Sequence, residues 1–196
     1  MSGAAPRFIC TPLFIPGVVA VQRQRIGDAR GRLSRLFCAD ELAAAGWGWP
    51  IVQINHTHTV RTGTVRGMHY QRPPHAEAKF VSCLRGRVWD VAVDLRAGSP
   101  TFLRWCAQEL SADNLTALLI PPGCAHGFQA LTDNVELLYL HSVAYAPDAE
   151  SGLRPIDPSL SITWPLPISE LSARDTGHPS LDGAFKALDM NGSVTA

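Results

Sequence analysis

Glycine and proline interrupt this sequence so often that long helices have little room, and most apolar stretches between them are short. These stretches are rich in Val, Ile, Leu and aromatic residues, a composition typical of β-strands. We expect strands at residues 81–84, 87–95, 118–120 and 135–140. We also expect hairpin turns at Arg85-Gly86 and at residues 132–134. Many short strands separated by turns predict an all-β sandwich or barrel.

Helical signals are sparse. A short helix is expected from Cys38 to Ala45, ending at Gly46, and a second over residues 180–188. Residues 111–114 are expected to open a turn or a single helical turn. A chain of 196 residues suits one domain spanning 1–196. Its core is expected over about residues 20–175, with an irregular C-terminal extension at 176–196 whose last residues are disordered.

Charge and cysteine usage exclude several classes of protein. Seventeen basic residues balance seventeen acidic ones, which argues against a nucleic-acid partner bound through a basic surface. No apolar run reaches the length of a membrane span, and the first sixteen residues lack the features of a signal peptide. The five cysteines are scattered and form no C-x-x-C pair, so we expect neither disulfides nor a zinc-thiolate site, and a cytoplasmic location.

The first candidate for acid–base chemistry lies in Arg66-Gly67-Met68-His69-Tyr70-Gln71. In a strand, His69 projects to the face opposite Met68 and Tyr70, where it can serve as a general base near neutral pH. A buried histidine bonded to backbone is the alternative interpretation. Asp175 is a candidate carboxylate partner for such a histidine. The sequence leaves open whether they meet, since Asp175 can equally be an exposed residue after a turn.

His126 follows a Pro121-Pro122-Gly123 turn, and this segment matches the second sequence motif of cupin barrels. In many cupins the histidine of this motif binds a metal, which would need a His-x-His pair and a carboxylate from the first motif. His69 has no second histidine two residues on. His56-Thr57-His58 has the spacing but no glutamate shortly after it, and residues 75–77 read as a loop. The incomplete ligand set disfavours a metal site.

Lys79 and Tyr139 each allow two interpretations. Lys79 enters an apolar strand, where a buried ammonium group needs an anionic partner unless it reaches the surface. Tyr139 ends an apolar run and is expected to be a core tyrosine whose hydroxyl reaches water, unless it belongs to a site with the residues above.

Taken together, several segments resemble one family. These segments are 65–71, Lys79, 88–96, 99–102, 120–128, 164–165 and 171–175, and the match extends over about residues 27–181. In order and spacing they resemble the dTDP-4-dehydrorhamnose 3,5-epimerases. The resemblance implies a cupin-type jelly-roll sandwich, a homodimer, and neither a metal nor an organic cofactor. It also implies epimerisation of a nucleotide-diphosphate-linked 4-keto-6-deoxyhexose at the carbons beside the ketone.

The same resemblance assigns roles by position. His69 is the expected base with Asp175 as its partner, and Tyr139 is the expected acid on the opposite face of the sugar. Lys79 and His126 would support the substrate and the developing enolate. Further contacts to the substrate or its diphosphate are implied for Arg30, Gln53, Asn55, Arg66, Glu150 and Arg174.

One segment departs from the family pattern. Asp28-Ala29-Arg30-Gly31 is retained, but Arg32 stands where an aromatic residue is usual and Arg35 where a glutamate is usual. Replacing a carboxylate by a guanidinium reverses a charge near the ligand, so recognition of the base or sugar is expected to differ. A mono-epimerase, acting at one carbon or on a CDP-linked sugar, is therefore one alternative. The others are a metal-dependent cupin enzyme and a non-catalytic sugar-binding cupin.

Overall fold

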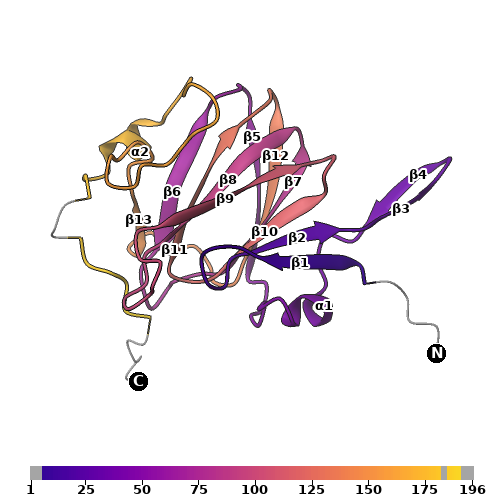
Figure 1. The fold of residues 1–196 in the computed structure, drawn as a ribbon, viewed down its shortest axis with the longest axis horizontal. Helices are drawn as coiled ribbons and strands as arrows, with labels where there is room; N and C mark the ends of the chain where they lie inside the picture. The colour runs from indigo at the N-terminus through magenta and orange to yellow at the C-terminus, as the bar shows by residue number, and fades with distance from the viewer. Residues whose placement is uncertain (1–5, 182–184, 191–196) are drawn as a thin grey trace.

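Two antiparallel sheets lie face to face in the computed structural model, which describes residues 6–181 and 185–190 (Figure 1). The six-stranded sheet has the order β1 (Phe8–Pro12), β2 (Val19–Arg23), β10 (Thr116–Ile120), β7 (Lys79–Arg85), β12 (Val135–His141) and β5 (Gln53–Thr59). The five-stranded sheet has the order β13 (Glu150–Gly152), β6 (Val65–Gln71), β11 (Cys124–Ala130), β8 (Arg87–Asp94) and β9 (Trp105–Ser111). The all-β jelly-roll class expected from the sequence is confirmed.

The chain changes sheet at both of the turns predicted to be hairpins, and this corrects those predictions. Strands β7 and β8 flank Gly86 but belong to different sheets, and so do β11 and β12, which flank residues 131–134. Each turn therefore carries the chain across the sandwich. The two crossings lie side by side, because the Arg87 N–H donates to the Thr132 hydroxyl (3.1 Å). Local turn composition signals a reversal but does not say which strand the next one will pair with.

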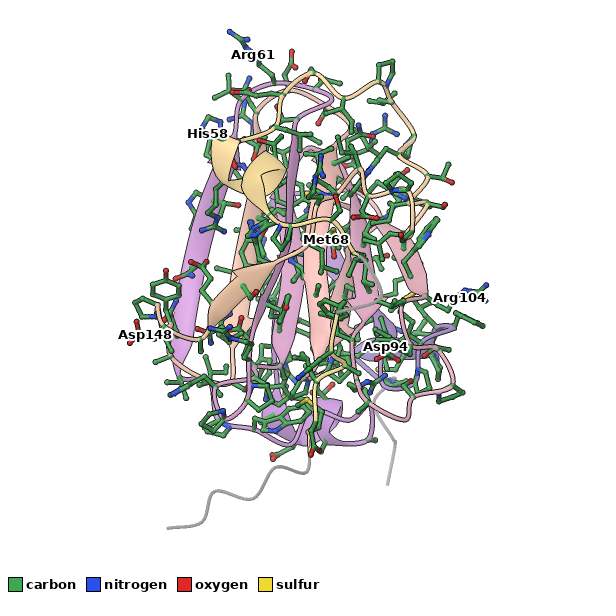
Figure 2. The ribbon with its side chains drawn as sticks, turned by 90° about the vertical axis from the view of Figure 1, so that its left-hand side faces the viewer. His58, Arg61, Met68, Asp94, Arg104 and Asp148 are labelled. Carbon is green, nitrogen blue, oxygen red and sulfur yellow. The ribbon has the colours of Figure 1, made fainter. Side chains whose placement is uncertain are left out.

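Apolar side chains fill the space between the sheets and cover both outer faces. The interior cluster includes Val81, Leu118 and Phe128. Outside the six-stranded sheet, helix α1 (Ala39–Ala43) and the segment after it bring Leu42 and Trp47 against Phe80. Outside the five-stranded sheet, the C-terminal segment packs on Met68 and its neighbours, near the middle of the view in Figure 2. This docked segment contains helix α2 (Ala173–Gly177).

The third sheet is a two-stranded hairpin, β3 (Arg25–Asp28) and β4 (Gly31–Ser34), that projects away from the sandwich (Figure 1). Ile26 and Leu33 on it are exposed. These apolar side chains are exposed because the projecting hairpin does not pack against the core of the sandwich. The hairpin is therefore a surface suited to contact with another molecule.

The predicted strands are confirmed, with ends shifted by a few residues, whereas the helices agree only in part. Helix α1 lies inside the predicted range 38–45, and 111–114 forms a turn. The helix predicted at 180–188 is wrong for residues 180–181 and 185–188, where Leu188 instead bridges to Arg96; residues 182–184 lie outside the described residues, as do 191–196. Neither helix in the described part of the chain has the length or apolar character to cross a bilayer.

Strand β6 contains an irregularity that matters for the site. Arg66 pairs with Phe128 and His69 pairs with His126, so three steps on β6 match two on β11. The extra residue is a β-bulge, which changes the side to which later residues point. Backbones approach closely here, since a Cβ on Gly67 would lie 2.5 Å from the Gly127 Cα. As a result, Arg66 and His69 both face the interior although they are three residues apart.

Candidate active site

A cavity of about 740 Å³ opens between the two sheets, and its lining contains most of the residues predicted from the sequence. A volume of this size suits a small-molecule ligand. Ten of the eleven predicted residues line it: Gln53, Asn55, Arg66, His69, Lys79, His126, Tyr139, Glu150, Arg174 and Asp175.

Arg30 is the one predicted residue that does not line this cavity. It lies at the tip of the β3–β4 hairpin, where its side chain is 90% exposed and bonds to Asp28. The two arginines that depart from the family pattern are nearby. Arg35 forms an ion pair with Glu41 of α1, and Arg32 donates to the Ala112 carbonyl (3.3 Å). All three guanidinium groups are therefore outside the cavity of their own chain.

The two sheets supply opposite walls of the cavity. On the six-stranded sheet, His141 is paired with Lys79 on one side and Gln53 on the other, and Tyr139 is paired with Asn55. Residues paired across antiparallel strands share a face, so these polar side chains form adjacent rows. On the five-stranded sheet, His69 and His126 are paired across β6 and β11. Two histidines thus face Tyr139 across the interior.

His69 and Asp175 come together although 106 positions separate them. His69 Nε2 lies 2.7 Å from Asp175 Oδ1, and the Asp175 side chain is 3% exposed against 31% for His69. Burial opposes ionisation of Asp175, but the bond to His69 holds the pKa of its carboxyl below the usual range. A carboxylate there fixes the proton of His69 on Nε2 and leaves Nδ1 free to accept another.

Helix α2 delivers Asp175 to this position. Ser172 is its N-cap, and the Ser172 hydroxyl accepts from the Asp175 N–H (3.0 Å). The Gly67 N–H donates to Asp175 Oδ2 (3.4 Å). The interpretation of Asp175 as an exposed residue after a turn is wrong. A helix was not predicted here because it has only five residues and ends just before Pro179.

Tyr139 is held between two histidine rings. The His126 ring meets it edge-on, with centroids 5.7 Å apart, and the His141 ring stacks on it, at 6.0 Å and 15°. His126 Nε2 in turn lies 2.9 and 3.0 Å from the carboxylate oxygens of the fully buried Asp90. Burial and the Asp90 carboxylate raise the pKa of Tyr139, so its hydroxyl stays protonated.

A chain of hydrogen bonds on the six-stranded sheet fixes which side-chain atoms donate and which accept. The Tyr145 N–H donates to Gln53 Oε1 (2.9 Å), and Gln53 Nε2 donates to Asn55 Oδ1 (3.1 Å). The Asn55 amide nitrogen therefore faces His141 Nε2, at 3.4 Å, and His141 Nδ1 lies 3.0 Å from Glu77 Oε2. Because a backbone donor starts the chain and a carboxylate ends it, His141 directs its Nδ1 to Glu77 and its Nε2 to Asn55.

Glu77 also pairs with Lys79, whose ammonium group lies 2.9 Å from Glu77 Oε1 and donates to the His69 carbonyl (3.3 Å). Burial acts to raise the pKa of Glu77, but Lys79 and His141 lower it to about 2. The anionic partner that Lys79 needs is thus present, and Lys79 does not reach the surface.

Sequence reasoning missed Glu77, His141 and Asp90 as parts of the site. Glu77 was assigned to a loop, yet its position two residues before Lys79 was a usable signal. His141 was overlooked, although it lies two residues after Tyr139 and so shares its face. Asp90 lies within the predicted strand 87–95, but no local feature indicates that it meets His126.

At the rim, Glu150 on β13 joins two other residues. It accepts from the Tyr145 hydroxyl (2.8 Å) and pairs with Arg174 (3.0 Å). On the adjacent strand, Arg66 donates to the Thr59 hydroxyl (3.1 Å). Two arginines at the mouth provide planar donors suited to an anionic group.

The histidines considered for a cupin metal site do not assemble around His126. His56 and His58 are exposed on β5, on the opposite face from Thr57, which lines the cavity, and His58 lies at the margin of the molecule in Figure 2. In the described residues, one group has ligand atoms close enough for a metal ion: His69, Asp175 and His178.

The jelly-roll fold and the acid–base residues in its cavity are typical of an isomerase that transfers protons. A family model for dTDP-4-dehydrorhamnose 3,5-epimerase matches residues 12–183. The chain therefore belongs to the dTDP-4-dehydrorhamnose 3,5-epimerase family, which confirms the resemblance and the isomerase class.

Individual relatives agree with this assignment. The chain is 38% identical to a dTDP-4-dehydrorhamnose 3,5-epimerase of Sinorhizobium fredii, covering 86% of this chain and 87% of that one. It is 40% identical to a dTDP-4-dehydro-6-deoxyglucose 3-epimerase of Streptomyces bikiniensis, covering 87% of each. The crystal structure of the Bacillus anthracis 3,5-epimerase with TDP and PPi bound superposes with a TM-score of 0.86 at 34% identity, covering 89% of this chain and 99% of that one.

Proposed function

We propose that the protein epimerises a dTDP-linked 4-keto-6-deoxyhexose by removing and returning protons at the carbons beside the ketone. The observation that carries this proposal is the 2.7 Å contact between His69 and Asp175 inside the cavity, with Tyr139 on the facing sheet. Relatives of this chain are named as 3,5-epimerases and as 3-epimerases, so the reaction class is common to both groups.

His69 acts as the base in this proposal. Its Nδ1 accepts the α-proton of the sugar, while Asp175 balances the positive charge that develops on the ring. The Asp175 carboxylate is formed before the substrate arrives, because its pKa is held below the usual range. A base fixed on a strand and oriented by a buried partner needs little reorganisation when the proton moves.

The enolate that results needs charge stabilisation at the former ketone oxygen. His126 and Lys79 are the donors we assign to it. His126 is held against the cavity by the bond between its Nε2 and the buried Asp90. Lys79 shares its charge with Glu77, so it contributes as a fixed donor more than as a free cation.

Tyr139 returns the proton from the other face. Inversion requires that the returning proton come from the side opposite the base, and Tyr139 projects from the facing sheet. Its raised pKa keeps the hydroxyl protonated until the strongly basic enolate carbon is ready to take the proton. The Tyr139 oxygen is then reprotonated from solvent.

The remaining lining residues bind the nucleotide part of the substrate. Arg66 and Arg174 offer guanidinium groups to the diphosphate at the mouth of the cavity. Gln53 and Asn55 present amide N–H groups, since their oxygens already accept bonds within the wall. Glu150 holds Arg174 in place.

We propose further that the protein is a cytoplasmic homodimer in which Arg30 contacts substrate in the partner's cavity. Arg30 is remote from the cavity of its own chain, and it sits on a projecting hairpin that exposes Ile26 and Leu33. A second copy that packs on this hairpin would bring Arg30 to the partner's substrate.

Deuterium exchange tests the reaction. The protein is incubated with dTDP- and CDP-4-keto-6-deoxyglucose in heavy water, and deuterium uptake is followed by mass spectrometry. Uptake at two carbons of the dTDP sugar supports a 3,5-epimerase, and uptake at one defines a mono-epimerase. Activity on the CDP sugar alone would overturn the nucleotide assignment, and no uptake with either would overturn the reaction. His69→Ala should abolish uptake.

A further inference from the structure

His178 has a buried ring nitrogen without a partner next to the His69–Asp175 pair. Its Nε2 is enclosed by protein and has no hydrogen bond among the described residues. The His178 ring meets the His69 ring edge-on, with centroids 6.5 Å apart. Buried polar atoms are almost always bonded, so this nitrogen, which no described residue engages, is available as a ligand atom. His178 is outside the proton-transfer machinery assigned above.

The absence of a side chain at Gly152 leaves space for the His178 ring. Gly152 on β13 is paired with His69 on β6, so a side chain at 152 would stand beside His69 on the same face. There is no such side chain, and the His178 ring occupies the space: a Cβ on Gly152 would lie 2.2 Å from His178 Nε2. The His178 ring therefore takes the place beside His69 that a side chain at position 152 would occupy.

We propose that His69, Asp175 and His178 form a binding site for a divalent transition-metal ion of the Zn²⁺ type. One ligand atom from each lies within 4.8 Å of the others. Two imidazole nitrogens and one carboxylate oxygen form a ligand set that Zn²⁺ accepts, with a fourth position left for water. Tetrahedral bonds of about 2.0–2.1 Å need ligand atoms about 3.3 Å apart. The His69–Asp175 contact must open slightly and His178 must move inward.

Metal binding would switch off the proposed reaction, an inference that rests on the proposed role of His69. A metal on His69 Nε2 needs the lone pair of that atom, so the Nε2 proton moves to Nδ1. The ring remains neutral overall, but Nδ1 then carries a proton and cannot accept one from the sugar. Asp175 is engaged by the metal as well. The ion and catalysis therefore exclude each other, and the site is inhibitory.

Equilibrium dialysis with ZnCl₂ tests the site without relying on activity. Metal-free wild type should bind one equivalent more than His178→Ala, and Co²⁺ at this site should show the visible absorption of a tetrahedral complex. His56→Ala is the matched control, because exposed His56 also lies beside a carboxylate, with its Nε2 3.2 Å from Glu136, but belongs to no group of three ligands among the described residues. Equal binding by wild type and His178→Ala would overturn the site.

Two further measurements distinguish loss of the metal site from misfolding of a variant and from absence of the proposed activity. Gly152→Ala keeps all three ligands but displaces the His178 ring, so it should also weaken binding, with its fold checked by circular dichroism. Zn²⁺ should inhibit deuterium exchange by wild type and inhibit His178→Ala at least tenfold less. Inhibition of both to the same extent would contradict the mechanism. Metal binding with no exchange in any variant would instead reject the proposed function alone.

Discussion

The Nε2 atom of His126 lies within hydrogen-bond distance of both carboxylate oxygens of Asp90, and solvent reaches neither side chain to any extent. Burial raises the pKa of the Asp90 carboxyl, and His126 opposes that rise. The pair supports the wall on which Tyr139 rests, because the His126 ring contacts the Tyr139 ring. The Asp90 carboxylate, which does not line the cavity, thereby orients the His126 ring, which does.

We expect Asp90→Asn to slow deuterium exchange by about 10²-fold, the usual effect of losing one aligned donor at an oxyanion. Asp94→Asn is the matched control. Asp94 is equally buried on the same face of β8, but it accepts from Arg96, Ser99 and Thr101. Its loss should lower the free energy of unfolding by about 2 kcal/mol and leave exchange near the wild-type rate. Equal loss of exchange in both variants would show a merely structural effect.

Asp175→Asn should reduce exchange by about 10²–10⁴-fold, the range of general acid–base catalysis. An amide can hold the His69 ring in place, but it can present its N–H₂ group to Nε2 and so stabilise the wrong tautomer. Initial exchange rates by mass spectrometry measure the effect. Ser172→Ala, which removes the N-cap hydroxyl but keeps the carboxylate, should cost far less. Wild-type exchange in Asp175→Asn would remove Asp175 from the mechanism.

Tyr139→Phe should separate exchange from inversion. His69 still removes the proton, so exchange continues, but the ring that returns a proton from the opposite face has lost its hydroxyl. We expect inversion to fall by at least tenfold more than exchange. Product stereochemistry is compared with deuterium content by NMR. Tyr145→Phe, which removes a hydroxyl bonded to Glu150 in the same cavity, should leave that ratio unchanged. A parallel fall of both activities in Tyr139→Phe contradicts the assignment.

Complementation between inactive variants tests the placement of Arg30. Arg30→Ala and His69→Ala should each be nearly inactive alone if Arg30 serves the partner's cavity. After unfolding and refolding together, random pairing leaves about one site in four intact, so about a quarter of wild-type activity should return. A mixture no more active than its parts would place Arg30 outside the site. Light scattering measures the oligomeric state in parallel.

Stability should fall in acid through Glu77. Its pKa is about 2 in the folded protein against an ordinary 4.5, so the folded chain binds fewer protons in this range than the unfolded chain. The stabilisation is complete above about pH 4.5 and is lost as the pH falls toward 2. It amounts to about 3 kcal/mol. Urea unfolding of Glu77→Gln should show a shallower loss across this range. An identical slope in both proteins would contradict the contribution of Glu77.

The strands and most of the site were predictable because each depends on short-range pattern. Alternation along β6 predicted that His69 points to the face opposite Met68 and Tyr70, and in the structure that face lines the cavity. The Pro-Pro-Gly turn predicted how the chain re-enters the sheet before His126, and Gly123 adopts the left-handed conformation that this turn needs. Pairing between strands was less predictable, since turns at Gly86 and at residues 131–134 looked like hairpins but cross between sheets.

What escaped prediction depends on contacts between distant segments. Arg66 reaches the cavity only because a bulge adds a residue to β6, and a strict alternation would have turned it outward. His141 gains its orientation from Glu77, 64 positions earlier. The unbonded nitrogen of His178 results from the absence of a side chain at Gly152. None of these contacts can be predicted from the residues of a single segment.

Because 106 positions separate His69 from Asp175, the order of synthesis matters for when the chain becomes active. The ribosome adds about 5–20 residues per second, so His69 is made roughly 5–20 s before its partner. During that interval every strand of the two large sheets has been made, yet the histidine lacks the carboxylate that orients it. A chain that ends before α2 therefore lacks the His69–Asp175 pair on which the proposed reaction depends.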